Sequence, residues 1–221
     1  MKKIKLVIFD MDGLMIDTER MYLETARITA QRLGINFTDE VVYKTIGLSN
    51  ANAENVYHEI LGNDFNYNNF MHELGISENA YLVDHPITKK KGLDELLNYL
   101  KGTDIKMAVA TSTSKIWAKE RLDAVNIYNY FDFIIYGDQL KDSKPNPEIY
   151  LKVLEHYNYS SEDAVIFEDS LNGLKAALNA NIRCVIIPDL CYIPDEMLEK
   201  AYKVYPDLSY GIQLIKENNK L

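Results

Sequence analysis

Two pairs of acidic residues each follow an apolar run that has the length of a β-strand. Asp10 and Asp12 come after the first run, and Glu168 and Asp169 end a later one. Residues two apart in an extended chain point the same way, so Asp10 and Asp12 can project together from one strand end. Carboxylates gathered in one place favour a hard divalent cation. Taken alone, the first pair could equally be an Asp-Gly turn and the second a helix cap.

Two further segments offer groups that suit a phosphate. Small hydroxyl residues run from Thr111 to Ser114, between an expected strand and an expected helix. Such a turn presents backbone N–H groups and a helix N-terminus to an anion, although it can also be a plain cap. Lys144 precedes Pro145 and Pro147, which stiffen the loop and start the next helix. Its ammonium could neutralise a phosphate, or it could be an ordinary exposed lysine.

The elements that must position these residues alternate between helix and strand after Pro86. Strands are expected at 4–9, 105–110, 133–136, 164–167 and 184–187, and helices at 90–101, 114–124, 146–157 and 171–180. This alternation predicts a doubly wound, Rossmann-like parallel α/β sheet with helices on both faces. The acids, the hydroxyl turn and the lysine then meet at the carboxyl ends of the strands, where open α/β sheets bind ligands.

Residues 15–86 break this alternation, because they show helical periodicity and no good strand. Helices are expected at 18–33, 38–45, 50–61 and 68–83, the first of them capped by Thr18 and ended by Gly34. We therefore expect an α/β core of residues 1–14 and 87–221, interrupted after its first strand by an all-helical cap of residues 15–86. An insert that leaves at this edge of the sheet is well placed to act as a lid.

The composition excludes several classes of protein. The 221 residues are 47% hydrophobic and 26% charged, which is a globular balance and not that of a disordered or collagen-like chain. With 24 basic and 33 acidic residues the net charge is −9, so we expect neither a nucleic-acid partner nor a membrane-surface one. Cys184 and Cys191 have no zinc-ligand spacing, and such low cysteine use suits a cytoplasmic protein. No signal peptide or membrane span is expected.

The order of these signals along the chain resembles the haloacid dehalogenase-like (HAD) superfamily, and within it the β-phosphoglucomutase-like branch of small phosphatases and mutases. The most specific stretches are residues 9–18, 143–147 and 168–173, and the likeness covers essentially the whole chain. The resemblance implies a Mg²⁺-dependent phosphomonoesterase with a helical cap. It also implies a small phosphorylated metabolite as the substrate and a monomeric protein.

The resemblance assigns catalytic roles to Asp10, Asp12, Thr111 and Lys144, and a phosphate-binding role to Ser112 as well. Asp10 would be the nucleophile that becomes an aspartyl-phosphate. Asp12 would be the general acid for the leaving alcohol and then the base for water. Thr111, with the amide of Ser112, would hold the transferring phosphate, and Lys144 would bridge the nucleophile and the phosphate. These roles fit the chemistry, because phosphoryl transfer depends on positioning and charge neutralisation.

The resemblance also implies a metal site. Mg²⁺ would lie between Asp10, the backbone carbonyl of Asp12 and Asp169, with Glu168 nearby. A cation there, together with an ammonium, would let an anionic nucleophile approach an anionic phosphate.

The cap residues bear on the subclass and the substrate. Asp12 argues against a dehalogenase, because dehalogenases of the superfamily lack an acid at that position. Tyr22 replaces a His of β-phosphoglucomutase, and Asn50 replaces an Arg that follows a Gly-x-Ser. A bisphosphate intermediate needs a second phosphate site, for which a fixed cation is the obvious means, so their loss favours a phosphatase. Arg20 or a lysine could substitute for them, and the mutase stays an alternative.

The same three cap residues, Arg20, Tyr22 and Asn50, are expected to set substrate choice. The neutral hydrogen-bonding groups of Tyr22 and Asn50 suit a sugar or polyol phosphate better than a doubly charged substrate. A non-catalytic phosphate-binding module that kept the fold is a further alternative. Such a module should have lost at least one core site residue, and none is missing from this sequence.

Overall fold

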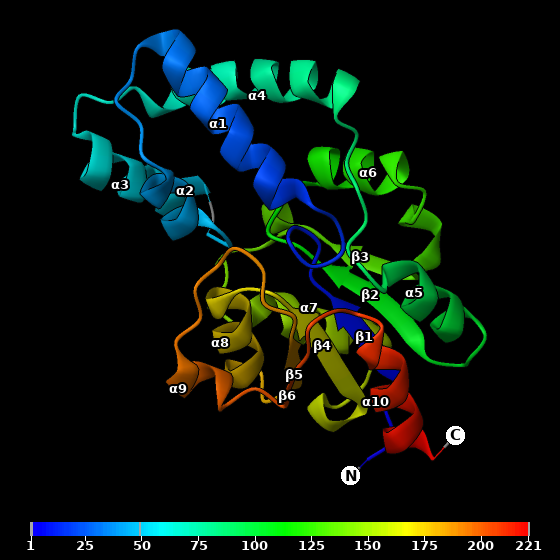
Figure 1. Ribbon diagram of the computed structural model, residues 1–221. Coiled ribbons are helices and arrows are strands. Elements are labelled where there is room, and N and C mark those ends of the chain that lie inside the picture. The colour runs from blue at the N-terminus through cyan, green and yellow to red at the C-terminus, as the bar shows by residue number, and fades with distance from the viewer. Residues whose placement is uncertain (1, 49, 221) are drawn as a thin grey trace.

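A six-stranded parallel sheet forms the centre of the computed structural model (Figure 1). The structure describes residues 2–48 and 50–220, without the side chains of residues 50 and 51. The strands are β1 (Leu6–Phe9), β2 (Lys106–Ala110), β3 (Phe133–Ile135), β4 (Ala164–Glu168), β5 (Arg183–Ile186) and β6 (Lys203–Val204). Their order is β3-β2-β1-β4-β5-β6. The predicted doubly wound sheet is confirmed, and β6 is a strand that the sequence analysis missed.

Alternate side chains of the buried strands enter two separate cores, one on each face of the sheet. In β1, Val7 and Phe9 belong to one core, whereas Leu6 and Ile8 belong to the other. The first face is covered by α5 (Leu93–Lys101), α6 (Lys115–Ala124) and α10 (Tyr210–Asn219), and the second by α7 (Glu148–Tyr157) and α8 (Leu171–Asn179). The short α9 (Asp195–Leu198) also packs on the second face. Strands covered on both faces are continuously apolar, which is why the sequence reveals them.

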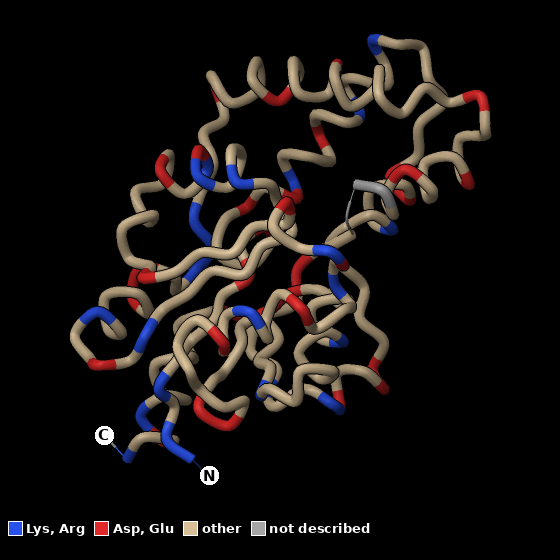
Figure 2. The backbone as a smooth tube through the Cα atoms, turned by 180° about the vertical axis from the view of Figure 1, so that it is seen from behind, with Lys and Arg blue, Asp and Glu red and all other residues tan. Residues whose placement is uncertain are grey.

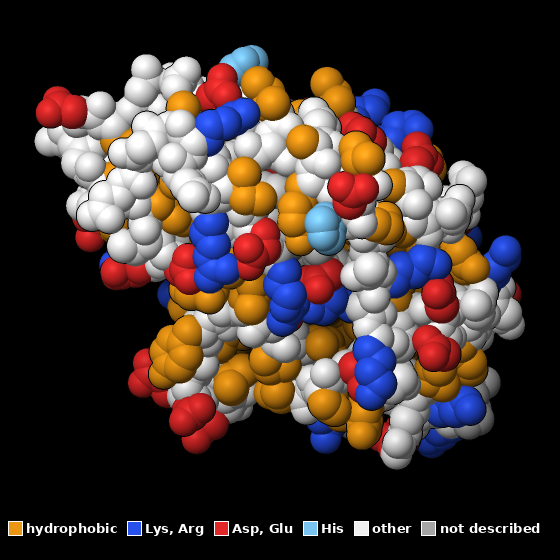
Figure 3. Space-filling view, turned by 45° about the horizontal axis from the view of Figure 1, so that its top comes forward, with side chains coloured by type: hydrophobic (Ala, Val, Ile, Leu, Met, Phe, Trp, Pro, Cys, Tyr) orange, Lys and Arg blue, Asp and Glu red, His pale blue; other side chains and the backbone are white. Residues whose placement is uncertain are grey.

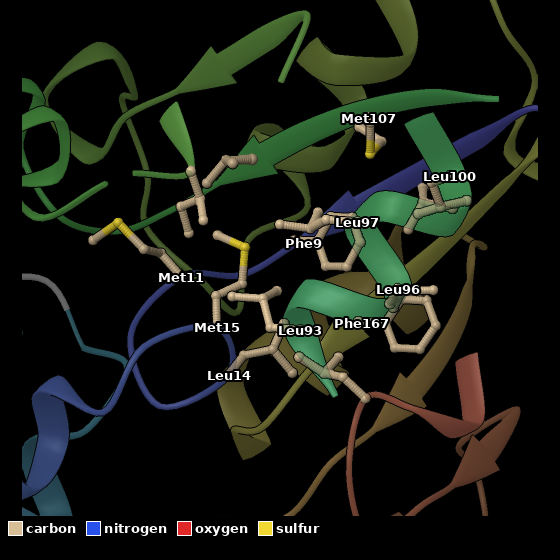
Figure 4. Close-up of a cluster of buried hydrophobic side chains, with 14 of the residues drawn as sticks. Phe9, Met11, Leu14, Met15, Leu93, Leu96, Leu97, Leu100, Met107 and Phe167 are labelled. Carbon is tan, nitrogen blue, oxygen red and sulfur yellow. The ribbon is translucent and has the colours of Figure 1, made fainter. Parts of the chain in front are cut away.

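Helix α5 packs one apolar face against the sheet (Figure 4). Its fully buried leucines recur at the spacing of one helix face and are Leu93, Leu96, Leu97 and Leu100. They lie against Phe9 and Phe167, whose stacked ring centroids are 5.6 Å apart. The helix begins later than the sequence predicts, because Gly92 precedes it with a left-handed φ of 83°. A Cβ at Gly92 would lie 2.1 Å from the backbone nitrogen of Ser209, so only glycine fits.

Four helices between β1 and α5 pack around a third core, above the sheet in Figure 1. They are α1 (Thr18–Leu33), α2 (Asp39–Thr45), α3 (Asn50–Leu61) and α4 (Tyr67–Asp84), close to the predicted ranges. Tyr57 and Phe70 are fully buried at the centre of this core, and their rings lie 5.5 Å apart. The helical unit therefore has its own apolar interior, distinct from the two cores of the sheet.

Two chain segments connect the helical unit to the sheet and run side by side. The N–H of Asp17 donates to the carbonyl of Thr88, and the N–H of Lys90 donates to that of Met15, both at 2.9 Å. The prediction that Thr18 caps α1 is wrong, because Asp17 takes the N-cap position and Thr18 is the first helical residue. The paired connections hold the start of α1 next to the loop that follows β1.

Basic and acidic residues are distributed along the described part of the chain (Figure 2). On the face drawn in Figure 3, basic and acidic side chains alternate with hydrophobic ones. Within the described residues, no helix has both the length and the apolar character that crossing a membrane requires.

The two chain ends lie close together below the sheet (Figure 1) and are joined by one side chain. The N–H of Ile4 donates to Oδ1 of Asn219 at 2.7 Å, and Nδ2 of Asn219 donates to the carbonyl of Ile4 at 2.9 Å. Both bonds are buried. The amide of Asn219 thus pairs with the backbone before β1 as a neighbouring strand would.

Replacing this amide should destabilise the fold. Asn219→Ala leaves two buried backbone groups without partners, at a cost of about 1–3 kcal/mol each, so we expect the free energy of unfolding to fall by about 2–4 kcal/mol. Urea denaturation followed by circular dichroism measures the change. The control is Gln213→Ala, an exposed position on the same helix, which should change it by less than about 0.5 kcal/mol. Equal effects of the two variants would contradict this role of Asn219.

Candidate active site

The buried ammonium of Lys144 joins two of the predicted acidic residues. Its Nζ donates to Oδ1 of Asp10 at 2.5 Å and to Oε1 of Glu168 at 2.7 Å, and also to the carbonyl of Ala110 at 3.2 Å. Lys144 is only 1% exposed. Burial opposes its charged form, but the carboxylates of Asp10 and Glu168 outweigh that effect and raise the pKa of Lys144 well above its usual value. The ammonium of Lys144 therefore lies where the ends of β1, β2 and β4 meet the loop after β3.

Both carboxylate oxygens of Glu168 are occupied by hydrogen-bond donors. Beside the lysine, the Tyr150 hydroxyl donates to Oε1 at 3.1 Å. Oε2 accepts from the N–H groups of Asp169 and Ser170 at 2.9 Å each, and from the Ser170 hydroxyl at 3.0 Å. Burial alone would raise the pKa of Glu168, but the lysine and these donors lower it. Glu168 thus serves as an ionised anchor that orients the lysine and the loop entering α8.

A divalent cation fits beside the carboxylates of Asp10 and Asp169, with Glu168 next to them. Oxygen atoms of Asp10, Glu168 and Asp169 all lie within 4.8 Å of one another, and Oδ2 of Asp169 is buried with no hydrogen-bond partner. Burial and the repulsion of Glu168 and Asp10 raise the pKa of Asp169 well above its usual value. Burial likewise raises the pKa of Asp10 to about 7, against the opposing effect of Lys144. The unpartnered oxygen of Asp169 is a hard donor of the kind that suits Mg²⁺.

Asp12 lies beside this group and is held at both of its carboxylate oxygens. Oδ1 accepts from the Thr18 hydroxyl at 2.6 Å and from the Arg121 guanidinium at 2.9 Å. Oδ2 accepts from the Thr113 hydroxyl at 2.7 Å and from that of Thr111 at 3.5 Å. The two carboxylates of the loop after β1 therefore have different partners, an ammonium for Asp10 and hydroxyls with a guanidinium for Asp12.

A cavity of about 560 Å³ opens between the carboxyl edge of the sheet and the helical unit. On the sheet side it is lined by most of the predicted residues, namely Asp10, Asp12, Thr111, Ser112, Lys144 and Asp169. Glu168 is fully buried behind this lining. On the other side, a Cβ at Gly47 in the loop after α2 would lie 3.2 Å from the hydroxyl of Ser170. The helical unit is thus in contact with the sheet edge and covers the cavity.

Of the three predicted cap residues, the structure brings Tyr22 to the cavity and leaves Arg20 outside it. Tyr22 lines the cavity, and its hydroxyl lies 2.9 Å from that of Tyr57. The side chain of Asn50 lies outside what the structure describes. Arg20 does not belong to the lining, because its guanidinium pairs with Asp17 at 2.9 Å and with Asp189 at 2.8 Å. The structure therefore does not bring Arg20 to the cavity, because its guanidinium is engaged with these two carboxylates instead.

Four charged residues of the lining were missed by the sequence analysis, Glu19, Glu78, Arg121 and Asp138. Burial, with repulsion from Asp12 and Asp10, raises the pKa of Glu19 to about 8. Burial also raises the pKa of Glu78, whose carboxylate lies 4.0 Å from the Arg121 guanidinium. Glu19 could have been found, because it directly follows Thr18 in the expected helix. Glu78 and Arg121 carry no motif and meet only through tertiary packing.

The assembled groups are those that a displacement at phosphorus requires. One carboxylate has a free oxygen and an ammonium beside it, and a second carboxylate lies two residues away to exchange a proton. Hydroxyl and backbone N–H groups at the end of β2 lie within the same cavity. An arrangement of this kind can transfer a phosphoryl group and neutralise its charge.

Comparison with known proteins places this chain among phosphate-handling enzymes. It is 38% identical to the phosphorylated carbohydrates phosphatase of Thermotoga maritima, over 80% of this chain and 81% of that protein. It is 29% identical to phosphoglycolate phosphatase 1 of Pseudomonas aeruginosa, over 83% of this chain and 69% of that protein.

A solved β-phosphoglucomutase from Clostridium difficile shares the fold. The TM-score is 0.81, the match covers 98% of this chain and 97% of the other, and the identity is 23%. The sequence model of the haloacid dehalogenase-like hydrolases matches residues 7–187, which span every element of the site described above. The chain belongs to the haloacid dehalogenase-like hydrolase family.

Proposed function

We propose that this chain is a Mg²⁺-dependent phosphatase that hydrolyses a small phosphomonoester, a sugar or related metabolite phosphate, through an aspartyl-phosphate on Asp10. The observation that carries the proposal is the buried Lys144, bonded to Asp10 and Glu168, beside the unpartnered oxygen of Asp169. The likeness to a phosphatase of phosphorylated carbohydrates supports this class of substrate.

In the first step, the free carboxylate oxygen of Asp10 forms a bond to phosphorus while the bond from phosphorus to the leaving oxygen breaks. Lys144 neutralises the nucleophile and the incoming phosphate, and the Thr111 hydroxyl and the Ser112 amide hold the phosphate oxygens. Asp12 gives a proton to the leaving alcohol. Each group lines the same cavity, so the step needs no large movement of the sheet edge.

In the second step, Asp12 takes a proton from water, and the water oxygen bonds to phosphorus as the bond to Asp10 breaks. The donors from Thr18, Thr113 and Arg121 hold the Asp12 carboxylate in place for this proton transfer. We assign the metal to Asp10, the backbone carbonyl of Asp12 and Asp169, with Glu168 as their neighbour. A bound Mg²⁺ would offset the negative charge that nucleophile and phosphate share.

The same proposal divides the chain into a catalytic core and a cap. Residues 1–14 and 87–221 form the catalytic core, and residues 15–86 form the cap that closes over the substrate. The separate apolar core of the helices and the paired connections at Asp17 and Lys90 support this division. Closure excludes water other than the attacking molecule, which strengthens the electrostatic contacts inside.

A phosphosugar mutase is the alternative, and the cap contacts favour hydrolysis over it. A mutase must hold a second phosphate, for which a free cation is suited. Arg20, the candidate for that role, is engaged with Asp17 and Asp189 outside the cavity. Conversion of β-glucose 1-phosphate to glucose 6-phosphate without phosphate release would favour the mutase.

Asp10→Asn should abolish turnover while leaving the fold intact. An amide cannot form the phosphoryl bond, so we expect phosphate release from a panel of sugar phosphates to fall at least about 1,000-fold. Circular dichroism should be unchanged. Asp104→Asn, at an exposed position before β2, is the matched control and should keep full activity. Appreciable activity of Asp10→Asn would remove Asp10 as the nucleophile.

Lys144→Met should impair both catalysis and stability. It removes the charge that neutralises the phosphate and leaves the buried carboxylates of Asp10 and Glu168 without their cation. We expect phosphate release to slow at least about 100-fold and the free energy of unfolding to fall by about 3–5 kcal/mol. Lys141→Met, an exposed change in the same loop, is the control for both measurements. Unchanged kinetics would show that the ammonium does not serve the phosphate.

Mg²⁺ should stabilise the folded protein through Asp169. A cation that binds only the folded state raises the melting temperature, and here it also relieves the repulsion among buried carboxylates. We expect a higher melting temperature in Mg²⁺ than in EDTA at equal ionic strength, with the increase lost in Asp169→Asn. An increase of the same size in Asp169→Asn would place the cation elsewhere.

A further inference from the structure

The cavity contains an ion pair that the catalytic groups do not account for. Glu78 extends from α4 in the helical unit and Arg121 from α6 beside the sheet, and their side chains are only 13% and 17% exposed. A guanidinium nitrogen of Arg121 lies 4.0 Å from Oε2 of Glu78, while the other donates to Asp12 at 2.9 Å. The pair therefore stands next to the proposed acid that protonates the leaving oxygen, on the side where the leaving group must lie.

Both cations of the described lining already face carboxylates of the protein. The lining contains two cations, Lys144 and Arg121. Lys144 is bonded to Asp10 and Glu168, and Arg121 is bonded to Asp12. The negative charge of the substrate phosphate and the positive charge of the metal would offset each other at the nucleophile. Neither would therefore change the net charge around Arg121.

The carboxylate of Glu78 is only loosely paired in this part of the cavity, because it lies 4.0 Å from a guanidinium that donates to Asp12. Glu78 and Asp12 share the single guanidinium of Arg121, and its hydrogen bond goes to Asp12. Burial raises the pKa of Glu78, a sign that this part of the cavity solvates an anion poorly. A carboxylate or second phosphate placed here would meet like charges where water screens them little.

A hydroxyl group meets no such penalty at the same place. It can donate to the carboxylate of Glu78 and accept from the guanidinium of Arg121, so that both partners of the ion pair are used. Apolar side chains of Met71 and Leu74, on the same helix as Glu78, line the adjoining wall and can cover the carbon chain. The volume of about 560 Å³ is ample for a sugar-sized molecule.

We infer that Glu78, with Arg121, makes this site selective for phosphomonoesters whose leaving group is an uncharged polyol, and excludes those that carry a second anionic group. The inference rests on the proposed phosphatase function and names its substrate class. It replaces the neutral cap contacts expected from the sequence with a charged pair as the basis of selectivity.

Two isosteric pairs of substrates isolate the charge. Glycerol 3-phosphate and 3-phosphoglycerate differ in a CH₂OH against a COO⁻ group, and sorbitol 6-phosphate and 6-phosphogluconate differ in the same way at six carbons. We expect kcat/KM to be at least about tenfold higher for the polyol of at least one pair, because like charges in contact cost a factor of this size or more. Equal rates within both pairs, or faster hydrolysis of the acids, would overturn the inference.

Glu78→Gln tests which residue discriminates. The amide keeps the shape and removes the charge, so the preference for the polyol should fall about tenfold, mainly through better use of the acid. Asp84→Asn removes an exposed acid from the same helix, outside the cavity, and should leave the preference unchanged. An unchanged preference in Glu78→Gln would remove Glu78 as its source.

Equilibrium binding separates the failure of this inference from that of the proposed function. Calorimetric titration of the Asp10→Asn variant in Mg²⁺ measures the affinity for each member of the pairs without turnover. If the wild type releases no phosphate but the variant still binds the polyol phosphate at least about tenfold more tightly, the phosphatase proposal fails and the selectivity stands. If the variant binds both members equally, the selectivity fails whatever the rates.

Discussion

The ion pairs of the buried Lys144 are the constraint on which the site depends. A buried ammonium is stable only if carboxylates surround it, and Asp10 and Glu168 supply them from the ends of β1 and β4. Those two strands are neighbours in the sheet, at the point where the strand order reverses. Lys144 itself lies in the loop after β3, which is the edge strand on the β1 side of the sheet. Electrostatics and topology therefore specify the same point.

Two glycines beside the buried carboxylates of Glu168 and Asp169 leave no room for a side chain. A Cβ at Gly173 would lie 1.7 Å from Oε1 of Glu168, and one at Gly13 would lie 2.3 Å from Oδ2 of Asp169. The two glycines let the backbone approach the carboxylates closely, and both Glu168 and Asp169 are buried. Their negative charge is then available to a cation, and the rigid sheet edge holds the groups in register for phosphoryl transfer.

The sequence predicts the sheet and the core of the site well, because both depend on local signals. Apolar runs that end in Asp10 or Asp169 reveal strands and their carboxyl ends together, and the parallel topology brings those ends to one edge. Strand β6 is only two residues long and exposed, so it leaves no apolar run to find. The cap is harder to predict, since the orientation of Arg20 and the meeting of Glu78 with Arg121 depend on how helices pack. A charge in a helix has the same sequence signature whether it faces a cavity or solvent.

The central claim is that Asp10 carries the phosphoryl group during turnover. Rapid mixing with Mg²⁺ and a sugar phosphate, followed by acid quench and mass spectrometry of the peptides, tests it most directly. We predict a phosphorylated peptide that contains Asp10 and forms and decays at the rate of phosphate release. Turnover with no phosphoryl group on Asp10, or with one on another residue, would contradict the account.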